Sequence, residues 1–152
     1  MALGGLEDYD PKRVRALRIK ARLSIDQVAV ACGVAMATAQ RWETGKYTPT
    51  PAKAGPLARV LGVDVADLTS ADKTQPTLIQ LRQWRALTAE TVAEQTGLSK
   101  DIIWTAERYV SKPTPETITT LAKAYEVSPG EIGHAWERGR AKKYGAFLGP
   151  SE

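Results

Sequence analysis

The sequence of 152 residues contains one cysteine, Cys32, and one histidine, His134. A single cysteine cannot form an intramolecular disulfide, and it is typical of a protein from a reducing compartment such as the cytoplasm. One cysteine and one histidine supply too few ligands for a Cys/His metal site, so we expect no metal and no cofactor. No nucleophile–base pair and no phosphate-cradling glycine loop is recognisable either, so the sequence predicts that the protein is not an enzyme.

Long apolar runs are also missing. No stretch approaches the roughly 18 apolar residues that a membrane helix needs. The N-terminal stretch MALGGLEDYDPKR places acids before bases and has no apolar core, so we expect neither a secretory signal nor a membrane partner. With 43% hydrophobic and 25% charged residues, the composition is that of a globular protein, and its net charge of +4 is mild evidence for a polyanionic partner.

The tripeptide Pro-Thr-Pro occurs twice, at residues 49–51 and 113–115. A shift of 64 positions superimposes these tripeptides and aligns residues 14–68 with residues 78–132 without a gap, with about 13 identities in 55 positions. Glycines, prolines and apolar positions coincide throughout, which predicts two related domains. The predicted divisions of the chain are a lead (1–11), a first domain (12–69), a linker (70–77), a second domain (78–134) and a tail (135–152).

Turn and cap residues predict helices in each copy. We expect Ser24 to cap a helix over residues 25–31, Gly33 to end it, and Gly45 to stop a third helix over residues 35–44. Pro56 should kink or delay the last helix of the first copy. The corresponding residues of the second copy include Thr88, Gly97, Ser99 and Thr114.

We also expect a terminal helix to about Lys143 and a mobile end after Gly149. The tail before that end is basic and aromatic, so it can bind DNA as an arm, pack on a partner chain or be disordered. No segment has the period of a strand, which predicts an all-α fold.

The stretch LSIDQVAVACGVAMATAQRWETGKYTPTP, residues 23–51, resembles the Xre/Cro-type, phage-repressor-like helix-turn-helix family. Its specific elements are Leu-Ser, Val-Ala, Gly-Val and the run Arg-Trp-Glu-Thr-Gly-Lys before Pro49. The second copy keeps most of these elements but lacks the Trp-Glu-x-Gly-Lys run, so it matches less well. The glutamine that often starts the first motif helix in this family is replaced by Ile25 and Ala89. The resemblance implies two tandem lambda-repressor-like domains of about five helices each, with double-stranded DNA as the partner.

In this family the second motif helix lies in the major groove and the following loop contacts phosphate. Ala39 and Trp42 should face inward. Arg41 can donate two hydrogen bonds to guanine, but it can instead pair with Glu43, and Tyr47 can instead stack within its own loop. The base contacts that the resemblance implies are Met36, Ala37, Gln40 and Arg41. The implied phosphate contacts are Ala35, Thr44, Lys46, Tyr47 and Thr48.

The matching positions of the second copy suit DNA less well. Asp101 would bring negative charge to the phosphates, and an exposed Trp104 would be typical of a protein interface. Trp104 can equally fold into the core, where Ala106 replaces Trp42. The candidates for a DNA or protein contact are Ser99, Lys100, Asp101, Trp104, Thr105, Arg108 and Lys112. Those for an interface are Trp84, Tyr109 and Trp136.

The charge differs between the two copies. Residues 12–69 contain ten Lys and Arg against four Asp and Glu, whereas residues 70–134 contain seven against eight. Because neutralisation of phosphates dominates non-specific affinity for DNA, the first copy is predicted to be the main reader.

The leading hypothesis is a cytoplasmic, sequence-specific transcriptional regulator, most often a repressor in this family. It would act as a homodimer on a palindrome or as one chain on an asymmetric site. The alternative is a protein-interaction adaptor, such as an antitoxin or a phage- or plasmid-encoded modulator, that uses the aromatic-rich second copy.

Overall fold

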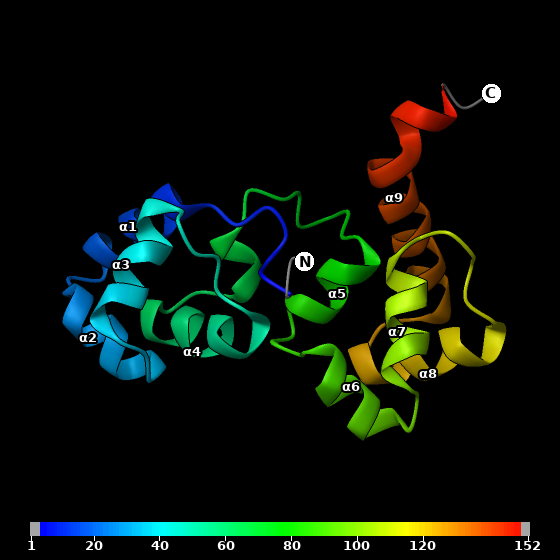
Figure 1. The fold of residues 1–152 in the computed structure, drawn as a ribbon, viewed down its shortest axis with the longest axis horizontal. Coiled ribbons are helices and arrows are strands. Elements are labelled where there is room, and N and C mark those ends of the chain that lie inside the picture. The colour runs from blue at the N-terminus through cyan, green and yellow to red at the C-terminus, as the bar shows by residue number, and fades with distance from the viewer. Residues whose placement is uncertain (1–3, 150–152) are drawn as a thin grey trace. The chain divides into compact units, whose positions relative to one another are not determined.

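The computed structural model describes residues 4–149, and all regular elements in that range are helices (Figure 1). An isolated bridge between Tyr9 and Thr69 is the only extended pairing among these residues. The predicted all-α fold is therefore confirmed. The chain forms two compact units: one contains the described residues to Ala71 together with residues 83–88, and the other contains residues 72–82 and the described residues from Ala89. The domain boundaries drawn from the repeat stay a prediction.

The first unit contains four α-helices and a short 3-10 helix: α1 (Pro11–Lys20), α2 (Ile25–Cys32), α3 (Met36–Thr44), α4 (Pro51–Leu61) and η1 (Val65–Leu68). Ser24 opens α2 through a capping box with Gln27, and Gly33 ends it in the left-handed conformation, as predicted. The helix α3 begins at Met36, one residue later than predicted, because Ala35 has the extended backbone of an N-cap. Gly45 ends α3, also in the left-handed conformation.

Pro56 lies inside α4 and does not delay it, so the predicted delay was wrong, while the predicted kink stays a prediction. The helix already begins at Pro51, which occupies a favoured first position for proline. Only one turn precedes Pro56, so the clash of its ring with the earlier carbonyl is limited to that turn. The neighbouring Gly55 has a packing role, because a Cβ there would lie 3.0 Å from the Cβ of Ala86.

The core of the first unit includes more than the predicted domain. Leu6, from the predicted lead, is buried among it, and its N–H donates to the carbonyl of Pro49 (3.1 Å). From residues 83–88, Trp84 and Ala86 pack against the same core. The members of this core that are at most 3% exposed are Val14, Val28, Cys32, Ala39, Trp42, Ala54, Leu57, Ala58 and Leu68.

The second unit contains α5 (Leu78–Gln83, of which Gln83 belongs to the first unit), α6 (Ala89–Thr96), α7 (Lys100–Glu107), α8 (Pro115–Tyr125) and α9 (Pro129–Leu148). Ser99 caps α7 by accepting from the N–H of Ile102 (3.2 Å), and Thr114 caps α8 by accepting from the N–H of Thr117 (3.2 Å), as predicted.

The helix α9 is longer than the sequence predicted. It runs for 20 residues to Leu148 instead of ending near Lys143 (Figure 1). Ile132, Ala135, Trp136 and Gly139 are buried, so the first part of the predicted tail belongs to the core of the second unit. The end predicted to be mobile, residues 150–152, lies outside the described residues. No helix within residues 4–149 combines the length and the apolar character that crossing a bilayer requires.

The repeat extends to the backbone conformation. Four residues of the first copy have a left-handed φ, and the residues 64 positions later share it even where glycine has been lost. A left-handed conformation costs a residue other than glycine about 1–2 kcal/mol, so the shared geometry reflects a shared turn structure. The pairs are Arg22 (60°) and Ala86 (58°), Gly33 (65°) and Gly97 (79°), Gly45 (81°) and Tyr109 (59°), and Gly62 (73°) and Glu126 (56°).

Candidate nucleic-acid interface

The helix α3 has one buried face and one open face. Ala39 and Trp42 are only 1% and 3% exposed, which confirms that they face the core. The predicted base-contacting residues lie on the other side: Met36, Ala37 and Gln40 are exposed, and Arg41 is half-buried. The open face therefore offers an amide and a guanidinium as hydrogen-bonding groups, with a methionine and an alanine beside them.

The N-terminus of α3 lacks a side-chain cap. Its N-cap residue is Ala35, whose methyl group cannot accept a hydrogen bond, and no side chain caps this end. Uncapped N–H groups at the start of a helix carry partial positive charge and favour anions. The predicted phosphate contact at Ala35 would use these backbone groups. The other predicted phosphate contacts, Thr44, Lys46, Tyr47 and Thr48, are all exposed around the end of the helix.

Arg41 and Tyr47 form a pair at the C-terminal end of α3. The guanidinium carbon of Arg41 lies 5.1 Å from the centroid of the Tyr47 ring, within the range of a cation–π interaction. The N–H of Tyr47 donates to the carbonyl of Arg41 (3.1 Å), and so does the hydroxyl of Thr44 (3.2 Å). Tyr47 thus stacks within its own loop, the alternative that the sequence left open.

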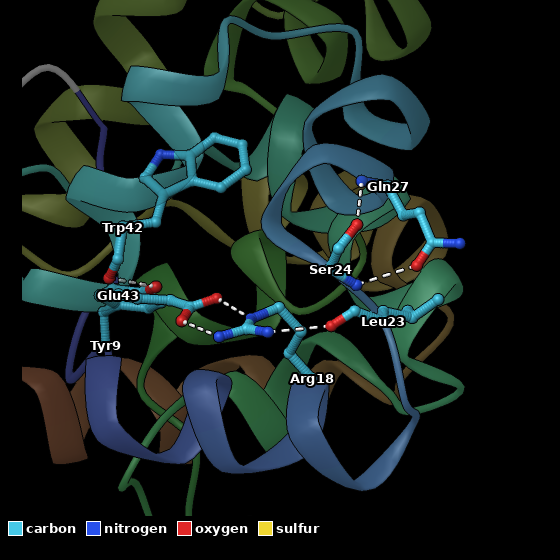
Figure 2. A network of polar contacts seen from close by, with 7 residues as sticks. All are labelled: Tyr9, Arg18, Leu23, Ser24, Gln27, Trp42 and Glu43. Atoms are coloured by element: carbon cyan, nitrogen blue, oxygen red, sulfur yellow. Dashed lines mark hydrogen bonds and ion pairs between the residues drawn. The ribbon is translucent and has the colours of Figure 1, made fainter.

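Glu43 pairs with Arg18 instead of Arg41. The Nε of Arg18 lies 2.6 Å from Oε2 of Glu43, and its Nη2 lies 3.0 Å from Oε1. Figure 2 shows that Arg18 also donates to the backbone carbonyl of Leu23 (2.9 Å), just before the capping box of α2. One side chain of α1 therefore connects the end of α3 to the start of α2.

A second contact holds the same end of α3. The hydroxyl of Tyr9 donates to the carbonyl of Trp42 at 2.8 Å (Figure 2). Burial, followed by the nearby charges of Glu43 and Asp10, raises the pKa of Tyr9 well above its usual value, so the hydroxyl stays protonated and can donate. Sequence reasoning missed both Tyr9 and Arg18. A signal for Arg18 was nevertheless present in the repeat. The shift of 64 positions aligns Arg18 with Arg82 and Glu43 with Glu107, so both charged residues occur in both copies.

The basic side chains of α1 divide into two groups. The first group contacts other parts of the first unit: Arg18 forms an ion pair with Glu43, and Arg13 donates to the backbone carbonyl of Asp67 (2.6 Å). The others are exposed and form no ion pair with any described residue: Lys12, Arg15, Lys20 and the adjoining Arg22. These cations remain available to a polyanion.

In the second unit the equivalent helix α7 has a different surface. Its N-terminus is capped by Ser99, and its first turn contains the acid Asp101. Lys100 lies 3.1 Å from Glu90 and 5.7 Å from the ring centroid of Trp104, so its charge is partly compensated. Trp104 is 42% exposed and has not folded into the core. Thr105, Arg108 and Lys112 are also exposed, with Lys112 at 3.8 Å from Glu137.

Two of the predicted interface aromatics are buried within the second unit, which corrects that prediction. Tyr109 and Trp136 are each 3% exposed, and their rings contact each other at 6.5 Å. The hydroxyl of Tyr109 accepts from the N–H of Ile79 (3.1 Å), and a Cβ on Gly139 would overlap its ring. The third, Trp84, is half-buried against the core of the first unit.

Cys32 is a small residue of the core of the first unit. It is 3% exposed, and burial raises the pKa of its thiol, an effect that the charge of Lys53 opposes. A buried thiol that stays protonated is a poor nucleophile and a poor metal ligand.

Comparison with known proteins agrees with this geometry. A family model described as a helix-turn-helix domain matches two segments, residues 12–71 and 77–135. No curated protein and no solved structure matched the chain. The two segments cover most of the sequence and coincide with the two copies of the repeat. The chain therefore belongs to the DNA-binding helix-turn-helix domain family, as a tandem protein with two copies of the domain.

Proposed function

We propose that this protein is a sequence-specific transcriptional regulator that reads the major groove of double-stranded DNA with α3, and that it represses transcription by occupying its site. The observation that carries the proposal is the open face of α3, where Gln40 and Arg41 lie opposite the buried Ala39 and Trp42. An amide and a guanidinium are the groups that bind adenine and guanine through paired hydrogen bonds. A regulator that binds DNA is expected in the compartment that contains the DNA, the cytoplasm or nucleoid.

The charge of the first copy supports the same role. Residues 12–69 have a net charge of +6, and four cations of α1 and its end are exposed without an ion-pair partner among the described residues. Lysine and arginine release counterions when they meet phosphates, which supplies much of the affinity. We assign phosphate contact to the uncapped N-terminus at Ala35 and to Thr44, Lys46 and Thr48.

The second copy is proposed to support the first instead of reading DNA strongly. Residues 70–134 have a net charge of −1, and α7 combines the acid Asp101, the paired Lys100 and the exposed Trp104. These features disfavour a close approach to phosphates and are compatible with self-association. We therefore expect a homodimer in which the second copy joins two chains.

Selection from a random duplex DNA library at near-physiological salt tests the proposal. Enrichment of an inverted repeat is the expected result and indicates a two-fold dimer. An asymmetric site spanning two successive grooves would mean that both copies of one chain read DNA, which contradicts the assigned division. Failure to enrich any sequence would contradict the regulator itself. Arg41→Ala serves as the control that should relax the selected preference at one base pair while keeping its fold.

A protein contact through the second copy, which the proposed homodimer and the alternative function as a protein-interaction adaptor share, is favoured by the exposure of Trp104. Tryptophan is a frequent anchor of protein interfaces, and Trp104, on α7, is 42% exposed. Trp104→Ala should lower self-association in sedimentation equilibrium without changing binding to a single half-site. Thr105→Ala, at an exposed neighbour, is the matched control. If Trp104→Ala leaves both properties unchanged, Trp104 has neither role.

A further inference from the structure

We infer that Tyr47 is a specificity-determining residue that holds the guanidinium of Arg41 ready for base readout and does not act as a phosphate contact. This inference rests on the proposed DNA-reading role of α3. It reassigns a residue that the family resemblance places among the phosphate contacts.

The first step is the geometry of the pair. The guanidinium of Arg41 lies over the Tyr47 ring at 5.1 Å, and the backbone N–H of Tyr47 donates to the carbonyl of Arg41 at 3.1 Å. Between them, Gly45 has a φ of +81°, which turns the chain back after α3. The backbone therefore fixes the position of the ring relative to the base of the arginine side chain.

The second step concerns competing partners. The acid next to Arg41 in sequence, Glu43, makes two short contacts with Arg18. No acidic side chain within residues 4–149 forms an ion pair with Arg41. The only charge-directed contact of Arg41 in that range is therefore the face of the Tyr47 ring. A cation–π contact attracts the charge of the guanidinium without using its N–H groups in a conventional hydrogen bond, so those groups stay available to a base.

The third step is the physical benefit. An arginine side chain has about 2 kcal/mol of rotamer entropy to lose when it is fixed. The contact with Tyr47 restricts the Arg41 side chain in the free protein, so less entropy is lost when DNA binds. The available N–H groups of the guanidinium match the two acceptors of guanine. A tyrosine that instead bonded a phosphate would strengthen binding to every sequence equally.

The second copy provides an internal comparison. The positions equivalent to Arg41 and Tyr47 are Thr105 and Ser111, so neither the guanidinium nor the ring is present. The pair thus occurs in the basic first copy, whose reading helix has an open face, and is absent from the copy whose equivalent helix has an acidic first turn. This distribution is expected if the pair serves base readout.

The test is a double-mutant cycle in the full chain, measured by fluorescence anisotropy on the duplex selected by the wild type and on duplexes with each base pair substituted. Tyr47→Phe keeps the ring and should bind within twofold of wild type. Tyr47→Ala should weaken binding to the selected site about threefold to fivefold, the worth of an exposed cation–π contact, and should reduce discrimination at the base pair read by Arg41. In the Arg41→Ala background, Tyr47→Ala should have no further effect.

Three outcomes would overturn the inference. The first is a loss of affinity in Tyr47→Phe that is equal on all duplexes, because it would assign the hydroxyl to a phosphate. The second is a Tyr47→Ala variant that keeps the wild-type base preference, or whose effect adds fully to that of Arg41→Ala. The third is a wild-type protein that selects no sequence, which would remove the proposed function together with this inference. The first two outcomes leave the proposed function standing.

A DNA-independent readout separates positioning from a loss of folding. The ring current of Tyr47 should shift the NMR signals of the Arg41 side chain in the free protein. Tyr47→Ala should move the Arg41 signals and leave the signals of the buried Trp42 unchanged. Tyr47→Phe keeps the ring, so it should leave the Arg41 signals close to their wild-type positions. Unchanged Arg41 signals in Tyr47→Ala would show that no stacking exists and would overturn the inference.

Discussion

Arg82 and Glu107 form a buried ion pair with two contacts, Nε–Oε2 at 2.7 Å and Nη2–Oε1 at 2.9 Å. Each residue lies 64 positions after its counterpart in the pair Arg18–Glu43, which has the same two contacts. The exposed surfaces of α3 and α7 differ. Each helix nevertheless has a glutamate at the equivalent position, paired with an arginine of the first helix of its copy. The second motif helix is therefore positioned in the same way in the copy that lacks the proposed reading residues.

Breaking the buried pair of the second unit should destabilise it strongly. The side chains of Arg82 and Glu107 are 6% and 7% exposed, so Glu107→Ala would leave an uncompensated buried charge. We expect the free energy of unfolding to fall by about 3–5 kcal/mol, measured by urea denaturation. Lys100→Met removes the exposed pair with Glu90 and should change stability by less than about 1 kcal/mol. Equal effects of the two variants would contradict this account.

Arg41 and Lys46 should affect DNA binding in different ways. Arg41→Ala removes a proposed bidentate base contact, so the affinity for the selected site should fall by about 1–3 kcal/mol and specificity should relax at one base pair. Lys46→Ala removes a proposed phosphate contact, so affinity should fall on all sequences and the salt slope should decrease by about 1. Anisotropy titrations at several salt concentrations distinguish the two, and an Arg41→Ala effect that is uniform across sequences would argue against base readout.

The stability of the fold should decrease at alkaline pH. Burial, with the charge of Glu43 for Tyr9 and of Glu107 for Tyr125, raises the pKa of both hydroxyls well above the ordinary value. The folded state therefore holds these protons more tightly than the unfolded state. Stability is fully present below the unfolded tyrosine pKa of about 10 and is lost above it, by up to about 1.4 kcal/mol per pH unit for each group.

Thermal unfolding between pH 8 and pH 11 measures this dependence, and the phenylalanine variants are its controls. Tyr125→Phe should weaken the dependence of stability on pH. It should change stability at neutral pH only slightly, because the buried hydroxyl of Tyr125 has no hydrogen-bond partner among the described residues. Tyr9→Phe should flatten it while losing the bond to the carbonyl of Trp42, worth about 1 kcal/mol. An unchanged pH profile in both variants would rule out these tyrosines as its source.

Two glycines of α9 should respond to alanine with opposite signs. A Cβ on Gly139 would overlap the ring of Tyr109, so Gly139→Ala should destabilise the second unit by about 1–3 kcal/mol. Apart from its chain neighbours and the nearby backbone of its own helix, no described atom lies within 4 Å of a Cβ on Gly133, so Gly133→Ala should stabilise the helix by about 0.5–1 kcal/mol. Melting temperatures of the two variants check the signs, and stabilisation by Gly139→Ala would be inconsistent with the packing described.

The features that the sequence predicted well depend on interactions between near neighbours. Ser24, Ser99 and Thr114 cap helices because a side-chain oxygen reaches an N–H three residues later. Gly33 and Gly45 end helices because they adopt a left-handed φ without strain. The shift of 64 positions identified both domains for the same reason, since cap, turn and core positions recur in order. The all-α fold, the family and the inward side of α3 followed from such signals.

Only the tertiary structure decided which groups meet across long separations. The sequence offered Arg41 as a partner for Glu43, and the pairing with Arg18 instead depends on how α1 packs beside α3. Tyr109 and Trp136 look like surface aromatics in the sequence, yet packing against each other and beside Gly139 buries both. Residues 83–88 lie within the second copy by sequence, but the contact of Ala86 with Gly55 places them with the first unit. Contacts of this kind depend on the shape of a complete core, which a local pattern does not contain.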